Sequence, residues 1–359
     1  MMDNSRYIEL LRQMVRIPSP SFEESAVCRC ICGGLDEWGI AYEVLNGNIV
    51  ACNKGFDPSK PTLALDAHID TVPPCGGYTR DPYEPGTESD AVYGLGSNDD
   101  GASVVAMIAA FSHFYEAELP FNLLLCLTRE EERSGPEGAK WLYEALPKGR
   151  IDWVVVGEPT GMRAATSERG LLVIDAQARG VSGHAARGEG VNALYIALDD
   201  IARLRAHRFD RVSPLMGEVH LNVTQIAAGT AHNVIPDKCS FVVDIRPTEQ
   251  YSNEEILAAL QAECRSVLTA RNLANRSSAT PEDSPLMKTI RALGIETFSS
   301  PTTSDWMRTG CAAIKMGPGD SARSHNADEY VLVSEIEDAI EKYIKFIDTF
   351  SYVINNTLE

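Results

Sequence analysis

The sequence predicts an α/β fold in which a mixed, largely parallel sheet is flanked by helices and interrupted by an inserted α+β domain. Helical and strand patterns alternate along the first part of the chain. The pattern changes to strands of period two after Gly170, and the helix–strand alternation returns from about Pro285. A chain of 359 residues also exceeds one ordinary core, so two domains are expected.

The larger domain is predicted from apolar periodicity and from the residues that end each element. Helical spacing predicts helices over 5–16, 23–38, 102–115 and 137–145. Short apolar runs predict strands over 41–45, 49–52, 62–67, 122–128 and 153–157. A further helix, a strand over 312–316 and a final helix over 334–348 complete this domain, which is expected to comprise 1–170 and 284–359.

The inserted domain is expected over 171–283. Period-two alternation predicts strands over 171–178, 218–226 and 240–245, and two helical stretches are expected over 192–205 and 254–269. The resulting order of strand, helix, strand, strand and helix is typical of a small ferredoxin-like α+β domain.

Composition excludes several classes of protein. The net charge of −19, from 32 basic and 51 acidic residues, repels phosphate backbones, so nucleic acid is not expected as a partner. The longest apolar runs are far shorter than a membrane span, and residues 1–14 lack the apolar core of a signal peptide. We therefore expect a cytoplasmic protein without a membrane partner, whose nine scattered cysteines stay reduced.

Histidines and acids follow four predicted strands at the point where each strand ends. They are His68 and Asp70, the triplet Glu130–Glu131–Glu132, Glu158, and His325 after a Gly-Pro-Gly turn. Asp99 precedes the helix predicted over 102–115. Each has an ordinary alternative, such as a helix N-cap for Asp99 or a solvated loop for the triplet. Because sites in open α/β sheets form at the carboxyl ends of strands, the set together predicts one site.

The residue types at this edge predict a metal centre. Carboxylates and neutral imidazoles form the mixed oxygen and nitrogen donor set that suits zinc or a similar divalent ion. Gathering Asp99, Glu132 and Glu158 without cations would be strongly unfavourable because like charges repel, and two divalent ions would relieve that repulsion. Asp70 is placed to accept the other imidazole N–H of His68 and so to fix its tautomer.

Seven motifs then resemble, in order, those of the acetylornithine deacetylase and succinyl-diaminopimelate desuccinylase family of metallohydrolases, a group that also includes glutamate carboxypeptidase and aminoacylase. The resemblance extends over nearly the whole chain and implies a zinc-dependent exopeptidase-like fold. The motifs begin at Asp66, Tyr93, Thr128, Gly157, Ser182, Asn233 and His325.

The resemblance implies a role for each residue of the metal centre. Asp99 would bridge two divalent ions, most simply zinc, with cobalt or manganese as alternatives. His68 and Glu158 would complete the coordination of one ion, and Glu132 and His325 would complete that of the other. Glu131 would be the general base that passes a proton from water to the leaving amine. Asp70, which orients His68, would also belong to the catalytic residues. The acidic triplet leaves two base and ligand pairs open, Glu130 with Glu131 or Glu131 with Glu132.

The inserted domain resembles the family's lid and dimerisation domain, which implies a homodimer. His184 would stabilise the oxyanion of the reaction, either in its own chain or across the dimer, and its alternative is a turn residue. Arg246 would hold the α-carboxylate of the substrate, with Asn233 close by, and the alternative for Arg246 is an ordinary ion pair.

The resemblance implies hydrolysis of the amide of a small N-acyl-L-amino acid. Chain length and the Gly157-Glu158-Pro159-Thr160 motif most resemble deacetylases of arginine biosynthesis, with N-acetylornithine or N-acetyl- or N-succinylcitrulline as substrate. The alternatives are desuccinylation of succinyl-diaminopimelate and aminoacylase or dipeptidase action. A metal-binding scaffold without catalysis is the alternative outside the enzymes.

Overall fold

The computed structural model describes residues 4–146 and 151–356, and the chain divides into two compact units. Unit 1 comprises Met1–Thr166, Thr280–Phe298 and Ser304–Glu359, and unit 2 comprises Ser167–Ala279 and Ser299–Thr303. The sequence prediction assigns Ser299–Thr303 to the larger domain. The segment groups with unit 2 because the Ser300 carbonyl accepts the Arg169 N–H at 3.1 Å and the Ser167 and Ser299 hydroxyls lie 2.8 Å apart.

Unit 1 contains a mixed sheet whose central strands are parallel, as the sequence predicts. The parallel strands are β5 (Asn122–Thr128), β3 (Thr62–His68), β6 (Trp153–Val156) and β16 (Ala312–Lys315), in that spatial order. Antiparallel strands extend the sheet on both sides, namely β1 (Glu43–Leu45), β2 (Asn48–Cys52) and β7 (Ala164–Glu168). Every residue of β3 and β5 is buried, as expected when helices cover both faces.

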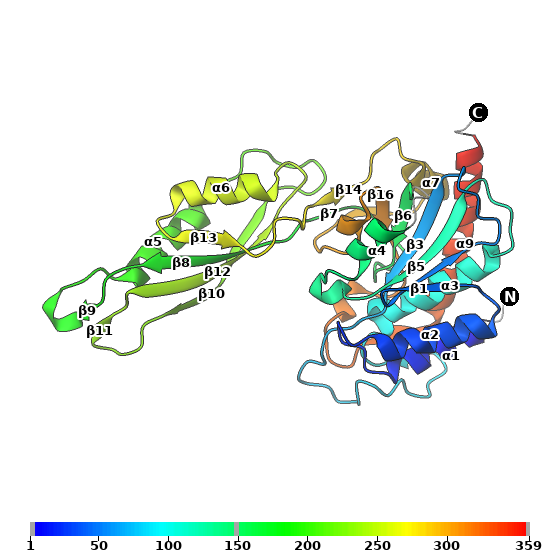
Figure 1. Cartoon of the computed structure of the whole chain (residues 1–359), viewed down its shortest axis with the longest axis horizontal. Helices are drawn as coiled ribbons and strands as arrows, with labels where there is room; N and C mark the ends of the chain where they lie inside the picture. Colours follow the sequence, from blue (N-terminus) through cyan, green and yellow to red (C-terminus); the bar gives the residue numbers. More distant parts are fainter. Residues whose placement is uncertain (1–3, 147–150, 357–359) are drawn as a thin grey trace. The chain divides into compact units, whose positions relative to one another are not determined.

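Two layers of helices enclose this sheet (Figure 1). One face packs against α1 (Ser5–Val15), α2 (Ser25–Glu37), α3 (Ala102–Phe114), α7 (Pro285–Leu293) and α9 (Val333–Asn355). The other face packs against α4 (Ala139–Ala145) and the short α8 (Trp306–Thr309). Because side chains alternate along β3, Leu63 and Leu65 face the first layer. Ala64, Asp66 and His68 then share the opposite face.

Unit 2 is built on a four-stranded antiparallel sheet. Its strands, in spatial order, are β10 (His220–Ala228), β12 (Lys238–Arg246), β8 (Leu172–Arg179) and β13 (Val267–Ala270). Helices α5 (Ala193–Ala206) and α6 (Asn253–Glu263) pack on one face through a shared apolar core (Figure 1). The chain order of strand, helix, strand, strand, helix and strand is ferredoxin-like.

The predicted helix over 254–269 is wrong in its second half. Helix α6 ends at Glu263, and Val267–Ala270 forms β13. Between them, the carboxylate of Asp200 on α5 accepts the backbone N–H groups of Arg265 and Ser266 at 3.1 and 2.7 Å. This contact, made across 66 positions of sequence, ends the helix despite the continuing apolar pattern.

The remaining strands are short and form two separate pairs and two additions to β7. In unit 2, β9 (Gly183–His184) pairs with β11 (Val234–Ile235). In unit 1, β4 (Ala91–Tyr93) pairs with β17 (Tyr330–Leu332). Strands β14 (Ser278–Ala279) and β15 (Thr297–Ser300) both pair with β7 where the chain passes between the units. Within 4–146 and 151–356, no helix has the length and apolar character needed to cross a membrane.

Candidate metal centre

The carboxyl ends of the parallel strands bring the predicted ligands of unit 1 to one edge of the sheet. His68 is the last residue of β3 and lies beside Thr128, the last residue of β5. Glu131 and Glu132 belong to a 3₁₀ turn, Glu131–Arg133, that begins three residues after the end of β5, and Glu158 follows β6 by two residues. Parallel strands therefore deliver these side chains to the same edge.

At Gly157, the chain after β6 packs closely against the segment Asp100–Ser103. A Cβ atom there would lie 2.6 Å from the Cβ of Ser103 and 2.9 Å from Oδ2 of Asp100. Only glycine therefore lets the end of β6, which carries Glu158, pack against the segment that carries Asp99.

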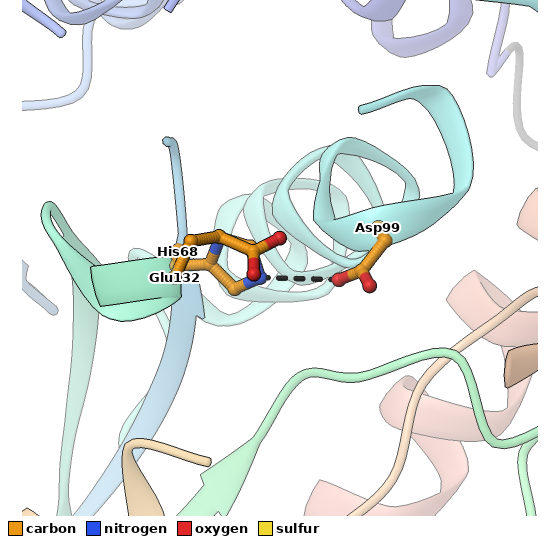
Figure 2. Close-up of side chains that lie close together, drawn as sticks. All are labelled: His68, Asp99 and Glu132. Carbon is orange, nitrogen blue, oxygen red and sulfur yellow. Dashed lines mark hydrogen bonds and ion pairs between the residues drawn. The ribbon is translucent and has the colours of Figure 1, made fainter. Parts of the chain in front are cut away.

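Asp99 lies between the two histidines of the predicted centre. Its Oδ1 is 3.2 Å from Nε2 of His68, and its Oδ2 is 3.8 Å from Nε2 of His325. Glu132 contacts the same nitrogen of His325, with Oε1 at 3.0 Å. Figure 2 shows His68, Asp99 and Glu132 converging from three separate segments. The two oxygens of one carboxylate thus face two different imidazoles, as a carboxylate that bridges two ions requires.

Two overlapping sets of potential ligands meet here. One set is His68, Asp99 and Glu132, and the other is His68, Glu131 and Glu158, each with one ligand atom per residue within 4.8 Å of the others. A donor set of carboxylate oxygens and imidazole nitrogens fits zinc and similar divalent ions. The described residues therefore form a candidate metal site.

Asp70 contacts His68 differently from the prediction. The Nδ1 atom of His68 lies 2.9 Å from the backbone carbonyl oxygen of Asp70, whereas the nearer carboxylate oxygen is 3.5 Å away. The carboxylate instead accepts the backbone N–H groups of Glu131 at 3.0 Å and Glu132 at 3.2 Å. It also accepts the hydroxyl of Ser21 at 2.7 Å. Asp70 therefore holds both the imidazole and the turn that carries the two glutamates.

Crowded negative charge shifts the pKa values of the acids at this edge. Burial raises the pKa of Glu131 well above its ordinary value, and the charges of Glu158 and Asp305 add to the rise, whereas His68 opposes it. Burial likewise raises the pKa of Glu158 to about 8, although the charge of Lys315 opposes this. Bound cations would favour the ionised form of both acids.

Both histidines take up protons readily. The hydrogen bond to Glu132 raises the pKa of His325 to about 9. Burial alone would lower the pKa of His68, but contacts with Asp70 and Asp99 raise it well above the ordinary value. A metal ion must displace these protons, because it binds the neutral imidazole.

The first acid of the triplet points away from the cluster. Glu130 has a left-handed backbone with φ of 63°, and its carboxylate lies 3.1 Å from Nη2 of Arg129. Its other oxygen accepts the backbone N–H of Glu137 at 3.0 Å. Glu131 and Glu132, by contrast, both belong to the sets of potential ligands.

Sequence reasoning missed two buried acids beside the centre. Oε1 of Glu329 accepts the backbone N–H groups of Asn98 and Asp99, both at 2.9 Å, and so orients Asp99. Its position four residues after His325 in the same motif is a signal that could have revealed it. Asp305, at the start of α8, accepts the hydroxyl of Thr128 at 2.8 Å, and no pattern in the sequence marks it.

In unit 2, the three predicted residues fall into two groups. His184 and Asn233 are neighbours, since the Ala185 N–H donates to the Asn233 carbonyl at 3.0 Å and β9 pairs with β11. Arg246 instead ends β12, where Nε and Nη2 donate to the carboxylate of Asp244 at 2.9 and 3.1 Å. The length of β12, roughly 26 Å at about 3.3 Å per residue, separates Arg246 from the end that leads to His184. Within one copy of unit 2, these three residues cannot surround one small ligand.

Metal binding should release protons at neutral pH. His325, with a pKa of about 9, and Glu158, with a pKa of about 8, both hold protons at pH 7 in the metal-free protein. We expect Zn²⁺ titration to release more than one proton per chain at pH 7, and the apparent affinity to rise with pH up to about 9. Calorimetry in buffers of different ionisation enthalpy measures this release. His113→Gln, outside the cluster, should leave it unchanged, and zinc binding without proton release would contradict the expectation.

Comparisons with known proteins agree with this geometry. The family model described as peptidase family M20/M25/M40 matches residues 64–349. A relative named succinyl-diaminopimelate desuccinylase from Delftia acidovorans is 28% identical, covering 93% of this chain and 95% of its own length. Its counterpart from Xylella fastidiosa is 27% identical, covering 96% and 98%.

Solved structures share the fold. The M20 family metallo-carboxypeptidase Sso-CP2 from Sulfolobus solfataricus has a TM-score of 0.77 at 16% identity, covering 98% of this chain and 100% of its own. A Bacillus subtilis protein described as a dinuclear metal-binding peptidase of the M20 family has a TM-score of 0.73 at 16% identity, covering 98% of each chain. With the family model extending over most of its length, the chain belongs to peptidase family M20/M25/M40, a family of metal-dependent hydrolases.

Proposed function

We propose that the protein is a two-zinc deacylase that hydrolyses the amide bond of an N-acyl amino acid. The observation that carries the proposal is the position of Asp99, whose two oxygens face His68 and His325. His68 and Glu158 would hold one ion, Glu132 and His325 the other, and Asp99 both. Bound together, two divalent cations would polarise the amide carbonyl and lower the pKa of water at the site.

Glu131 is the general base of the proposed reaction. Its turn is anchored by Asp70, and burial among other acids raises its pKa well above the ordinary value. Bound cations would favour its ionised form, which can accept a proton from water and return it to the leaving amine. Glu130 does not compete for this role, because Arg129 and the Glu137 N–H occupy its carboxylate.

The lid residues support a homodimer. His184 and Asn233 lie at one end of unit 2 and Arg246 at the other, so one chain cannot present all three to one substrate. In the proposed arrangement, His184 reaches the site of a second copy and stabilises the oxyanion, with Asn233 beside it. Arg246 binds the substrate carboxylate and exchanges its contact with Asp244 for that ligand.

We propose an N-succinyl amino acid as the substrate, with N-succinyl-diaminopimelate first. Support comes from the relatives at 27–28% identity, whose name states this reaction. The expectation of N-acetylornithine or N-acylcitrulline rests on motif resemblance alone. These compounds carry the same amide on an α-nitrogen and belong in the same assay.

Replacing the base should remove catalysis without removing metal. We expect zinc-loaded protein to release amine from one member of a panel of N-acetyl and N-succinyl derivatives of diaminopimelate, ornithine and citrulline. Glu131→Gln should lower kcat by about 10²–10⁴-fold at unchanged zinc content, measured by amine release and metal analysis. Glu144→Gln, on the exposed side of α4, should behave as wild type. Full activity in Glu131→Gln would refute its role, and a zinc-loaded protein inactive on the whole panel would refute the deacylase proposal.

Mixing two inactive variants tests action across subunits. His184→Ala and Glu131→Gln should each be inactive as homodimers. Mixed dimers then contain one site with both native groups, so activity should recover to about one quarter of wild type after random exchange of subunits. Recovery is measured after co-refolding or co-expression of the two chains. If His184 acts within its own chain, every site keeps one defect and the mixture stays inactive.

A further inference from the structure

Glu24, Arg129 and Glu130 form a network of charged side chains next to the 3₁₀ turn Glu131–Arg133. The proposed reaction does not use these three residues directly. The side chains of both glutamates are only 2% exposed, and that of Arg129 is 18% exposed. One nitrogen of the guanidinium, Nη2, lies 3.1 Å from a carboxylate oxygen of each glutamate. A single cation thus joins the residue before α2 to the first acid of the triplet.

The network also holds the backbone of the turn. Oε1 of Glu24 accepts the N–H of Glu130 at 3.2 Å and that of Phe22 at 2.6 Å. Asp70 accepts the next two N–H groups, those of Glu131 and Glu132. Three consecutive backbone N–H groups are therefore fixed by buried carboxylates from two other parts of unit 1.

The chain beyond the turn wraps around the side chain of Glu130. Its Oε2 accepts the N–H of Glu137 at 3.0 Å. A Cβ atom at Gly135 would lie 2.1 Å from that same oxygen, and one at Gly138 would lie 1.9 Å from the carbonyl oxygen of Arg129. The two glycines thus permit a close fit that a side chain at either position would prevent.

We propose that Glu130, joined to Glu24 through Arg129, is a positioning residue that sets Glu131 for proton transfer and Glu132 for metal binding. The inference rests on the proposed function, in that it assigns those two roles to its neighbours. Glu130 touches neither substrate nor metal and acts through the backbone of the turn. This explains why the triplet contains a third acid.

The test is a set of variants of the network, each measured in three ways. Glu130→Gln keeps the size of the side chain, but its amide NH₂ must face either Arg129 or the Glu137 N–H, which are both donors. Arg129→Lys keeps a cation between the two carboxylates and serves as the conservative variant. Glu23→Gln is the matched control, because it makes the same exchange at an exposed side chain next to Glu24. The measurements are kcat and KM, zinc affinities of the metal-free protein by chelator competition, and thermal unfolding.

For folded Glu130→Gln, we expect kcat to fall by about 10–100-fold with KM within about twofold, and the weaker zinc site to lose affinity by a similar factor. Arg129→Lys should retain most of the wild-type kcat and zinc affinity, and Glu23→Gln should match wild type. If Glu130→Gln only lowers the unfolding temperature, with kcat per folded molecule and both zinc affinities unchanged, the role is structural and the proposal is overturned.

A second variant, Glu24→Gln, tests the positioning role of the network if Glu130→Gln does not fold. Glu24→Gln disturbs the same network from the segment before α2, and the same losses are expected. Zinc competition needs no substrate, so it tests the network even if the proposed deacylase reaction fails. Unchanged zinc affinities in a folded Glu24→Gln protein would overturn the proposal.

Discussion

Negative charge gathered at one edge of the parallel sheet, from the segments after β5 and β6 and the segment before α3, is the constraint on which this site depends. Asp99, Glu131, Glu132 and Glu158 lie close together, and burial raises the pKa of Glu131 and Glu158. Such a cluster is unfavourable without cations, and two divalent ions offset the repulsion. Glu131 lies among the same charges, so the groups that would bind metal also set the electrostatic environment of the proposed base.

The scaffold keeps this crowded geometry by fixing backbone rather than side chains. Buried carboxylates from distant segments accept the backbone N–H groups of the acids at this edge. Glu329 accepts that of Asp99, Asp70 those of Glu131 and Glu132, and Glu24 that of Glu130. Hydrogen bonds from N–H groups to carboxylates are stronger than neutral ones, and they orient a turn without occupying the metal-facing oxygens. The ligand side chains can then exchange a proton for a metal ion without a rearrangement of the turn.

The sequence was sufficient to predict the parallel sheet and the residues gathered at its edge, because most of the ligands closely follow an apolar run or precede a helix, and His325 follows the Gly-Pro-Gly turn after such a run. It did not reveal Glu24 or Glu329, whose contacts join positions 106 and 230 residues apart. Strand β13 was missed for the same reason, since a contact from Asp200 ends α6. The motifs also did not identify the substrate, because they contain the metal ligands and the base, and these serve hydrolysis of many different acyl groups.

The most direct test of the account is the zinc content of wild-type protein and of Asp99→Asn after metal repletion and removal of free ions. If Asp99 joins two ions, wild type binds two zinc ions per chain, and Asp99→Asn retains fewer than about one because both sites lose a ligand. Two tightly bound ions in Asp99→Asn, or a single ion in wild type, would contradict the central claim.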